Sequence, residues 1–113
     1  MNDRELLELA AKAAEVTGGW GEKIEYHNGA VDLRDVWILE GDDFVPWNPL
    51  DDDGDALRLA VKLAIEISPC PEHDSVLCEP KGSPDSIITT EALDDYGTRR
   101  AIVRAAAEIG RTK

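Results

Sequence analysis

The sequence predicts an α+β fold in which a small antiparallel sheet, built from hairpins, is sandwiched by about three helices in the order α-ββ-α-ββ-α. Three segments, at the two ends and in the middle of the chain, carry apolar residues at helical spacing. Short runs of alternating apolar and polar residues, bounded by turn residues, lie between them. The 113 residues are enough for one hydrophobic core. We therefore expect residues 1–113 to form a single α/β/α sandwich domain.

The first helix is predicted to run from Asn2 or Asp3 to Val16. Either of the first two residues can cap its amino end, and leucine and alanine recur along one side. Gly18 and Gly19 follow, and we expect one of them to end the helix in the left-handed conformation that glycine adopts without strain.

The segment between the first two helices predicts two or three short strands. Apolar and polar residues alternate around Ile24, and Asn28-Gly29 is a strong signal for a tight hairpin. Asp35 interrupts the alternation, so a separate strand is expected from Val36 to Leu39.

The stretch from Trp47 to Ile67 predicts the central helix. Asp52 and Asp55 have the spacing of a capping box, and carboxylates complement the dipole at a helix start. Apart from one charged stripe, the residues from Ala56 to Ile67 are apolar, which is typical of a buried helix that ends before Pro69.

The last third of the chain predicts a hairpin and a helix. Strands are expected at Val76–Cys78 and Ser86–Thr90, joined by a turn at residues 80–84 and paired antiparallel. The final helix should cover residues 98–110, with Gly110 as its end and small residues that let it lie close to a sheet.

The charge of the chain restricts its partners. Twenty-four acidic against twelve basic residues give a formal charge of −12, so nucleic acid and anionic membranes should repel it. The first residues lack a signal-peptide pattern, and no apolar stretch has the length of a membrane span. We expect a cytoplasmic protein, in a bacterial host cell, with two reduced cysteines and no cofactor.

Two longer motifs carry a family resemblance. WNPLDDDGDALRLAVKL in the middle and TRRAIVRAAAEIGR near the end, together with the opening LLELAAKAAEV, resemble a family of small phage and prophage proteins that share the "phage ABA sandwich" domain. The family is distantly similar to the NinX protein of lambdoid phages. The resemblance implies the fold and a phage origin. It implies no catalytic residue, because the family has no established activity.

An acidic interaction surface is the leading functional hypothesis. Between residues 32 and 55 there are nine acidic residues and one basic residue, Arg34, an excess of eight negative charges. Such a surface can steer the protein to a basic host or phage protein, with mimicry of DNA phosphates as a sharper version. The expected surface residues are Asp42, Asp43, Asp51, Asp52, Asp53, Trp37, Arg100 and Arg104.

Two alternatives belong to other classes of protein. Cys70, His73 and Cys78 have ligand types that suit zinc, although a buried cysteine and an exposed histidine explain the same residues. A hydrolase that uses surface carboxylates with Mg²⁺ is the other alternative, but none of the common catalytic motifs is present. The acids before the central helix do not fit a calcium loop in either register.

The remaining distinctive residues have structural explanations. Among the three tryptophans we expect Trp47, and one other, to fill the core. The arginines of the last helix are expected to pair with acids of the same molecule, and they are Arg99, Arg100, Arg104 and Arg111.

Overall fold

The structure, a computed structural model, describes residues 1–25, 27–29, 31–41, 45–82 and 86–113, with the backbone alone for residues 22–25 and 31–36. Its strands form two three-stranded antiparallel sheets, β1-β2-β3 and β4-β5-β6, so the α+β class is confirmed. The elements in chain order are α1 (Asp3–Ala14), β1 (Gly18–Glu25), β2 (Val31–Leu39), β3 (Pro46–Trp47), α2 (Asp53–Lys62), β4 (Ile65–Cys70), the 3₁₀ turn η1 (Pro71–His73), β5 (Ser75–Pro80), β6 (Thr89–Ala92) and α3 (Asp95–Arg111).

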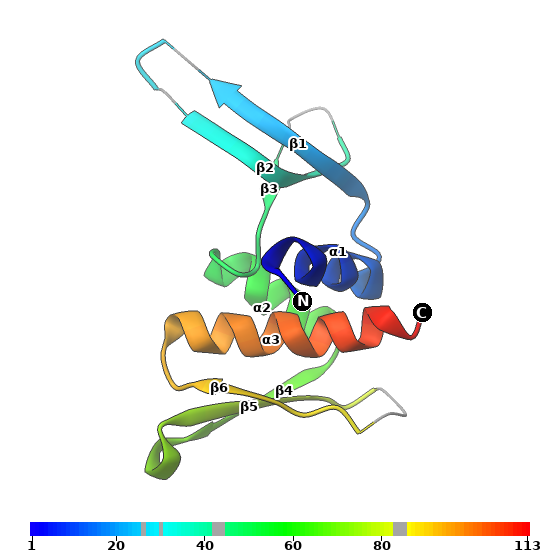
Figure 1. The fold of residues 1–113 in the computed structure, drawn as a ribbon, viewed down its shortest axis with the longest axis vertical. Coiled ribbons are helices and arrows are strands. Elements are labelled where there is room, and N and C mark those ends of the chain that lie inside the picture. Colours follow the sequence, from blue (N-terminus) through cyan, green and yellow to red (C-terminus); the bar gives the residue numbers. More distant parts are fainter. Residues whose placement is uncertain (26, 30, 42–44, 83–85) are drawn as a thin grey trace.

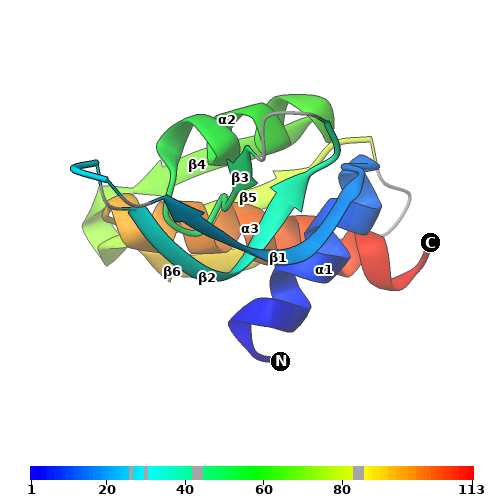
Figure 2. The same ribbon diagram turned by 90° about the horizontal axis from the view of Figure 1, so that it is seen from above.

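The helices lie between the two sheets (Figure 1). On one side α3 covers β5 and β6, whose Val76, Cys78 and Thr89 are buried. On the other side the hairpin β1-β2 rises from α1 and α2, and seen from above it crosses the helix layer with β1 on the α1 side (Figure 2). The layers therefore run sheet, helices, sheet, where we expected a sheet between helices.

The predicted start of α1 is correct and its predicted end is wrong. Asn2 caps the helix by accepting a hydrogen bond from the Glu5 N–H at 2.8 Å. The helix ends at Ala14, and Glu15 takes the left-handed conformation with φ 56°. Gly18 and Gly19 instead open β1. The Val16 N–H reaches the carbonyl of Ala11 at 2.9 Å, so the chain reverses before it meets the glycines.

The hairpin at Asn28-Gly29 is confirmed, because β1 and β2 pair antiparallel on either side of it. The positive φ angles fall on His27 and Asn28. A separate strand after Asp35 is wrong, since β2 runs through that residue to Leu39. The break in alternation coincides with a register shift between Gly21 and Lys23 on β1, which lets both strands continue.

The central helix is shorter and less buried than predicted. α2 ends at Lys62, and the apolar residues after it form the edge strand β4, which pairs with β5. Periodicity alone cannot separate the end of a helix from a short apolar strand. Leu59 is 3% exposed, but Leu57 and Val61 are 60% and 73% exposed, so α2 buries one side. Pro69 lies inside β4, where an edge strand tolerates it.

The second hairpin is confirmed with shifted bounds. β6 covers Thr89–Ala92 instead of Ser86–Thr90, and residues 83–84 of the predicted turn lie outside the described residues. The Thr89 hydroxyl donates to the carbonyl of Ala101 at 2.6 Å, and this buried bond ties β6 to α3. The close approach of α3 to a sheet is therefore confirmed.

The final helix begins earlier than predicted, because Asp94 caps it, and Gly110 does not end it. α1 and α3 run side by side in the same direction, since Asp3 contacts Arg100 and the carbonyl of Ala13 accepts from Lys113. A Cβ at Gly110 would lie 2.0 Å from the carbonyl oxygen of Leu9. Glycine is therefore required here for helix contact. In the part of the chain that is described, no helix has the length and apolar content to cross a membrane.

Candidate interaction surface

The starts of α2 and α3 lie on one side of the molecule and are built around capping carboxylates. Asp52 accepts a hydrogen bond from the Asp55 N–H at 2.7 Å, and Asp94 accepts one from the Gly97 N–H at 2.6 Å. These bonds satisfy amide groups that have no partner inside the helix. Two of the acids on this side are therefore fixed in position by the fold.

Arg99 on α3 joins the two helix starts. Its Nε donates to the carbonyl of Leu50 at 2.9 Å, and its Nη1 lies 2.6 Å from Asp53 Oδ1. The hydrogen bond with Asp53 is the largest cause of the raised pKa of the guanidinium. Desolvation opposes it, and the charges of Asp53, Asp95 and Asp51 add smaller effects that raise the pKa. The negative charges of all three carboxylates therefore act on the same arginine.

Asp55 is a structural residue. It is buried, and its carboxylate accepts from the Asn48 N–H at 2.9 Å and from Arg58 Nη2 at 2.7 Å. The spacing of the predicted capping box is correct, but the carboxylate of Asp55 reaches Asn48 instead of the N–H of Asp52. Asp55 holds the turn before α2 and offers little to a partner.

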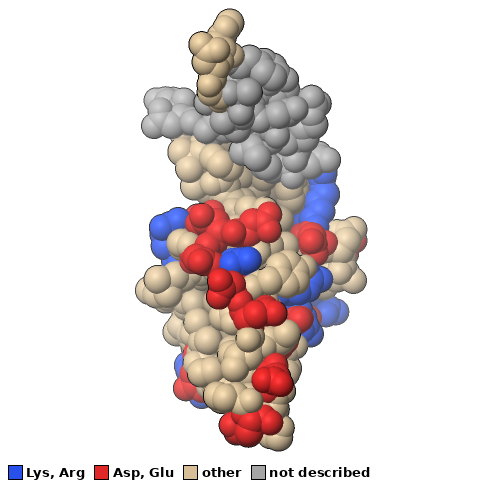
Figure 3. Space-filling model, turned by 90° about the vertical axis from the view of Figure 1, so that its left-hand side faces the viewer, with Lys and Arg blue, Asp and Glu red and all other residues tan. Residues whose placement is uncertain are grey.

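Acidic side chains gather on this side of the molecule, with basic side chains among them (Figure 3). A hollow of about 270 Å³ opens there between the first turn of α1, the turn before α2 and the start of α3. Trp20 and Tyr96 line it together with Asp3, Asp51 and one basic residue, Arg4, and Tyr96 is 54% exposed. We name this surface the acidic face and define it by Asp3, Asp51, Asp52, Asp53, Asp94 and Asp95.

The predicted acidic cluster is only partly the one that the fold assembles. Asp51, Asp52 and Asp53 belong to the acidic face, whereas Asp42 and Asp43 lie outside the described residues. Two further acids, at positions 32 and 35, lie on β2 in the protruding hairpin, away from α2 (Figure 1). Their places on the face are taken by the acids that begin α1 and α3, at positions 3, 94 and 95. Of these three, only Asp3 was predicted at a helix start, because the last helix was expected to begin at residue 98, and the convergence of all three depends on helix packing.

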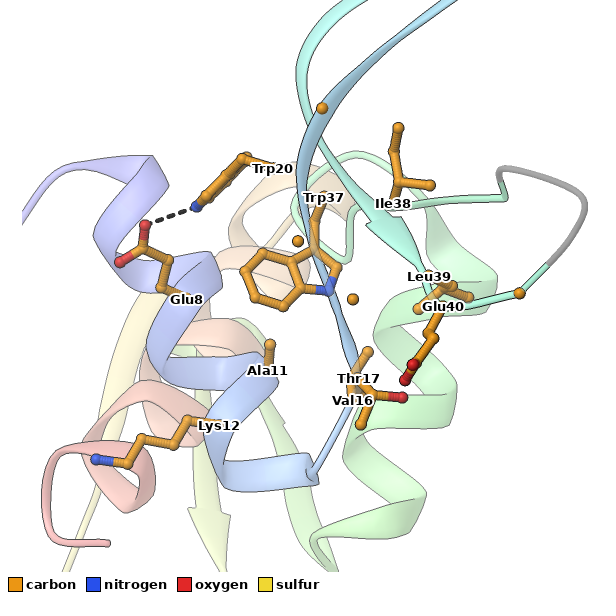
Figure 4. Close-up of a pocket in the computed structure, with 14 residues that line it drawn as sticks. Glu8, Ala11, Lys12, Val16, Thr17, Trp20, Trp37, Ile38, Leu39 and Glu40 are labelled. Carbon is orange, nitrogen blue, oxygen red and sulfur yellow. Dashed lines mark hydrogen bonds between the residues drawn. The ribbon is translucent and has the colours of Figure 1, made fainter.

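The tryptophans occupy one rung of the sheet, because Trp37 pairs with Trp20 on β1 and with Trp47 on β3. Trp47 is 5% exposed, so its predicted core position is confirmed. Trp20 and Trp37 are half-buried and meet edge to face, with ring centroids 5.5 Å apart. Glu8 on α1 accepts from Trp20 Nε1 at 2.6 Å (Figure 4). The Arg4 guanidinium lies 4.4 Å from the Trp20 ring centroid. Trp37 therefore belongs to the foot of the hairpin and is not one of the residues that line the hollow of the acidic face.

The arginines of α3 pair with acids of the same molecule, as predicted. Arg100 lies 2.9 Å from Asp3, and Arg104 lies 2.6 Å from Glu91. The hydrogen bond with Asp3 raises the pKa of Arg100. Both predicted surface arginines thus neutralise neighbouring carboxylates.

The three candidate zinc ligands are spread over β4, η1 and β5. Cys78 faces the core, and burial raises the pKa of its thiol to about 11, which disfavours the thiolate that binds metal. Cys70 pairs with Ser75 on β5, while Cys78 pairs with Ile67. Among the described residues, no three histidine, cysteine, aspartate or glutamate side chains form a group that could hold a metal ion. Neither the zinc module nor the Mg²⁺-dependent hydrolase gains support.

Fold and site together define an α+β protein with a helix layer between two antiparallel sheets and an acidic face at the helix starts. No protein-family model, curated protein or solved structure matches the chain. The resemblance to the phage ABA sandwich family stays a prediction.

Proposed function

We propose that the protein is a non-catalytic accessory protein that binds a basic segment of another protein through its acidic face. The observation that carries this proposal is the convergence of acids from the starts of three helices on one side of the molecule, around a hollow edged by two aromatic rings. The family resemblance supports a host or phage protein in a bacterial cytoplasm as the partner.

The capping bonds favour binding because they hold carboxylates in place before a partner arrives. Asp52 and Asp94 are anchored by backbone amides, and Asp53 is anchored by Arg99. Binding to groups that are already ordered costs less conformational entropy. The exposed ring of Tyr96 adds a surface on which a lysine or arginine side chain can stack.

The mimicry of DNA phosphates is less well supported. Several acids of the face carry their own cation, because Asp53 pairs with Arg99, Asp3 pairs with Arg100, and Arg58 lies 3.8 Å from Asp52. A mimic of duplex DNA requires a regular array of unneutralised charges. A face of mixed sign with an aromatic hollow fits a short basic segment better.

Capture from host lysate at low and high salt, with a matched pair of double variants, tests the proposal. Asp51→Asn with Asp95→Asn removes two exposed charges from the acidic face and leaves the caps intact. Glu15→Gln with Glu66→Gln removes two exposed charges that follow the ends of α1 and α2, at the opposite ends of these helices from the acidic face.

We expect the wild-type protein to capture a partner at low salt and to release it at high salt. The variant of the acidic face should bind the purified partner about 5- to 30-fold more weakly, at about 0.5–1 kcal/mol for each charge, and the variant at Glu15 and Glu66 should bind like the wild type. The proposal is wrong if no salt-sensitive partner is captured, or if the two double variants lose the same affinity.

A further inference from the structure

The free edge of β1 offers backbone groups for another strand. β1 is the outer strand of its sheet, and the Glu40 N–H donates to the carbonyl of Thr17 at 3.0 Å just before β1 begins. Hydrogen-bonded and non-bonded pairs alternate along an antiparallel ladder. Gly19 therefore directs its N–H and C=O toward β2, whereas Gly18 and Trp20 direct theirs away from the sheet.

A hollow of about 980 Å³ lies beside this edge (Figure 4). One wall is a single face of α1, with Glu8, Ala11 and Lys12 at helical spacing. The other wall is the start of β1 and the end of β2, where the lining residues are Val16, Thr17, Gly18, Gly19, Trp20, Gly21, Trp37, Ile38, Leu39, Glu40 and Gly41.

The glycines keep the edge accessible. Gly19 is exposed, and a Cβ at this position would have no atom within 4 Å. Trp37, which lines the hollow, has an unpaired donor: its Nε1 is buried and has no acceptor among the described residues. An unpaired buried donor is costly, and because this atom has no exposed surface, a carbonyl of an entering chain reaches it only if the indole ring turns toward the hollow.

We propose that the edge of β1 binds an extended, basic segment of a partner protein as an additional strand. Main-chain bonds to Gly18 and Trp20 supply the register, and alternate side chains of the segment enter the hollow over Ala11. Charge decides the occupant. Glu8 is paired with Arg4 at 3.7 Å, and Glu40 faces the hollow together with Lys12, so the walls are close to neutral. The net charge of −12 attracts a basic segment and repels a second copy.

Amide hydrogen exchange, followed residue by residue by NMR, tests this docking mode. The probe is a synthetic eight-residue peptide of alternating lysine and valine, blocked at both ends. In the free protein the amides of Gly18 and Trp20 should exchange faster than that of Gly19, because they face solvent. The peptide should saturate below about 1 mM and slow their exchange at least about tenfold.

Matched substitutions locate the effect. Gly19→Lys adds a positive charge at the edge, and Gly82→Lys adds the same charge at a second exposed glycine whose Cβ would also meet nothing within 4 Å. Binding should weaken severalfold in the first variant and stay unchanged in the second. A peptide that carries an N-methyl group at every residue has no main-chain donor on either edge, and it should no longer protect either amide.

Three results would overturn the proposal: no binding, binding that leaves the exchange of Gly18 and Trp20 unchanged, or protection that rises with protein concentration when no peptide is present, which would make a second copy the occupant. The proposal does not depend on the acidic face. Amide exchange at residues 18 and 20 tests only the β1 edge, and the capture experiment tests only the acidic face. A negative result in one experiment therefore leaves the other proposal standing.

Discussion

Replacement of Gly110 by alanine should destabilise the protein, although alanine is the better helix former. Within α3 the change favours the helix by up to about 1 kcal/mol. The added Cβ, however, would lie 2.0 Å from the carbonyl oxygen of Leu9, and both atoms belong to backbones of packed helices that cannot rotate away. α1 and α3 would have to separate, and overpacking of this kind costs about 1–3 kcal/mol. We expect a net loss of about 1–2 kcal/mol.

The matched control is Gly54→Ala in α2. A Cβ there would lie 3.2 Å from the flexible end of Arg58, which can move aside, and 3.2 Å from the capping oxygen of Asp52, which has to shift by only a few tenths of an ångström and can keep its bond to the Asp55 N–H. This variant should be neutral or up to about 1 kcal/mol more stable than the wild type. The same chemical change should therefore have opposite signs in the two helices.

Urea unfolding followed by circular dichroism measures both effects, as shifts of the midpoint at constant m value. A thermal midpoint lower by about 4–8 °C per kcal/mol should accompany the loss at Gly110. If both variants are stabilised, the contact between α1 and α3 is looser than described and the helix layer is incorrectly assembled.

Further predictions concern burial in the rest of the fold. Thr89→Val removes the hydroxyl that donates to Ala101, and urea unfolding should show a loss of about 1 kcal/mol; no loss would mean that β6 is not held to α3 by this bond. Leu59→Ala should lower the free energy of unfolding by about 2–5 kcal/mol and Leu57→Ala by less than about 0.5 kcal/mol, because only Leu59 is buried. Equal losses would mean that α2 is buried on both sides, as the sequence predicts. Below pH 9 the thiol of Cys78 is protonated in both the folded and the unfolded state. Because its pKa is raised to about 11, the free energy of unfolding should fall between pH 9 and 11 as only the unfolded thiol ionises, and Cys78→Ala should reduce this fall.

Local signals in the sequence predicted most elements, and packing decided their bounds. Asn28-Gly29 predicts the place of the hairpin correctly, but the connection between the paired Glu25 and Val31 is longer than a two-residue turn, and the positive φ angles fall on His27 and Asn28. The apolar run from Ala56 to Ile67 was wrongly taken as one helix, because a helix end and an edge strand read alike until the pairing with β5 is known. Gly110 looked like a helix end, and only the neighbouring α1 shows why it lacks a side chain.

The candidate site was predictable to the extent that it depends on local structure. Asp52 was recognisable as part of a helix start from its spacing to Asp55. The contribution of Asp94 was not, because it caps a helix that begins far away in the sequence and meets α2 only in the folded chain. The bridge from Arg99 to Leu50 joins residues nearly half a chain apart, and one sequence contains no signal for it.

The footprint of a captured partner is the most direct measurement of the acidic face. Amide hydrogen exchange of the complex should slow at residues 48–53 and 94–99, while exchange at residues 65–67 of β4, which follow the far end of α2, stays as in the free protein. A footprint confined to the outer face of β4-β5-β6, with no change at the starts of α2 and α3, would contradict the proposed function.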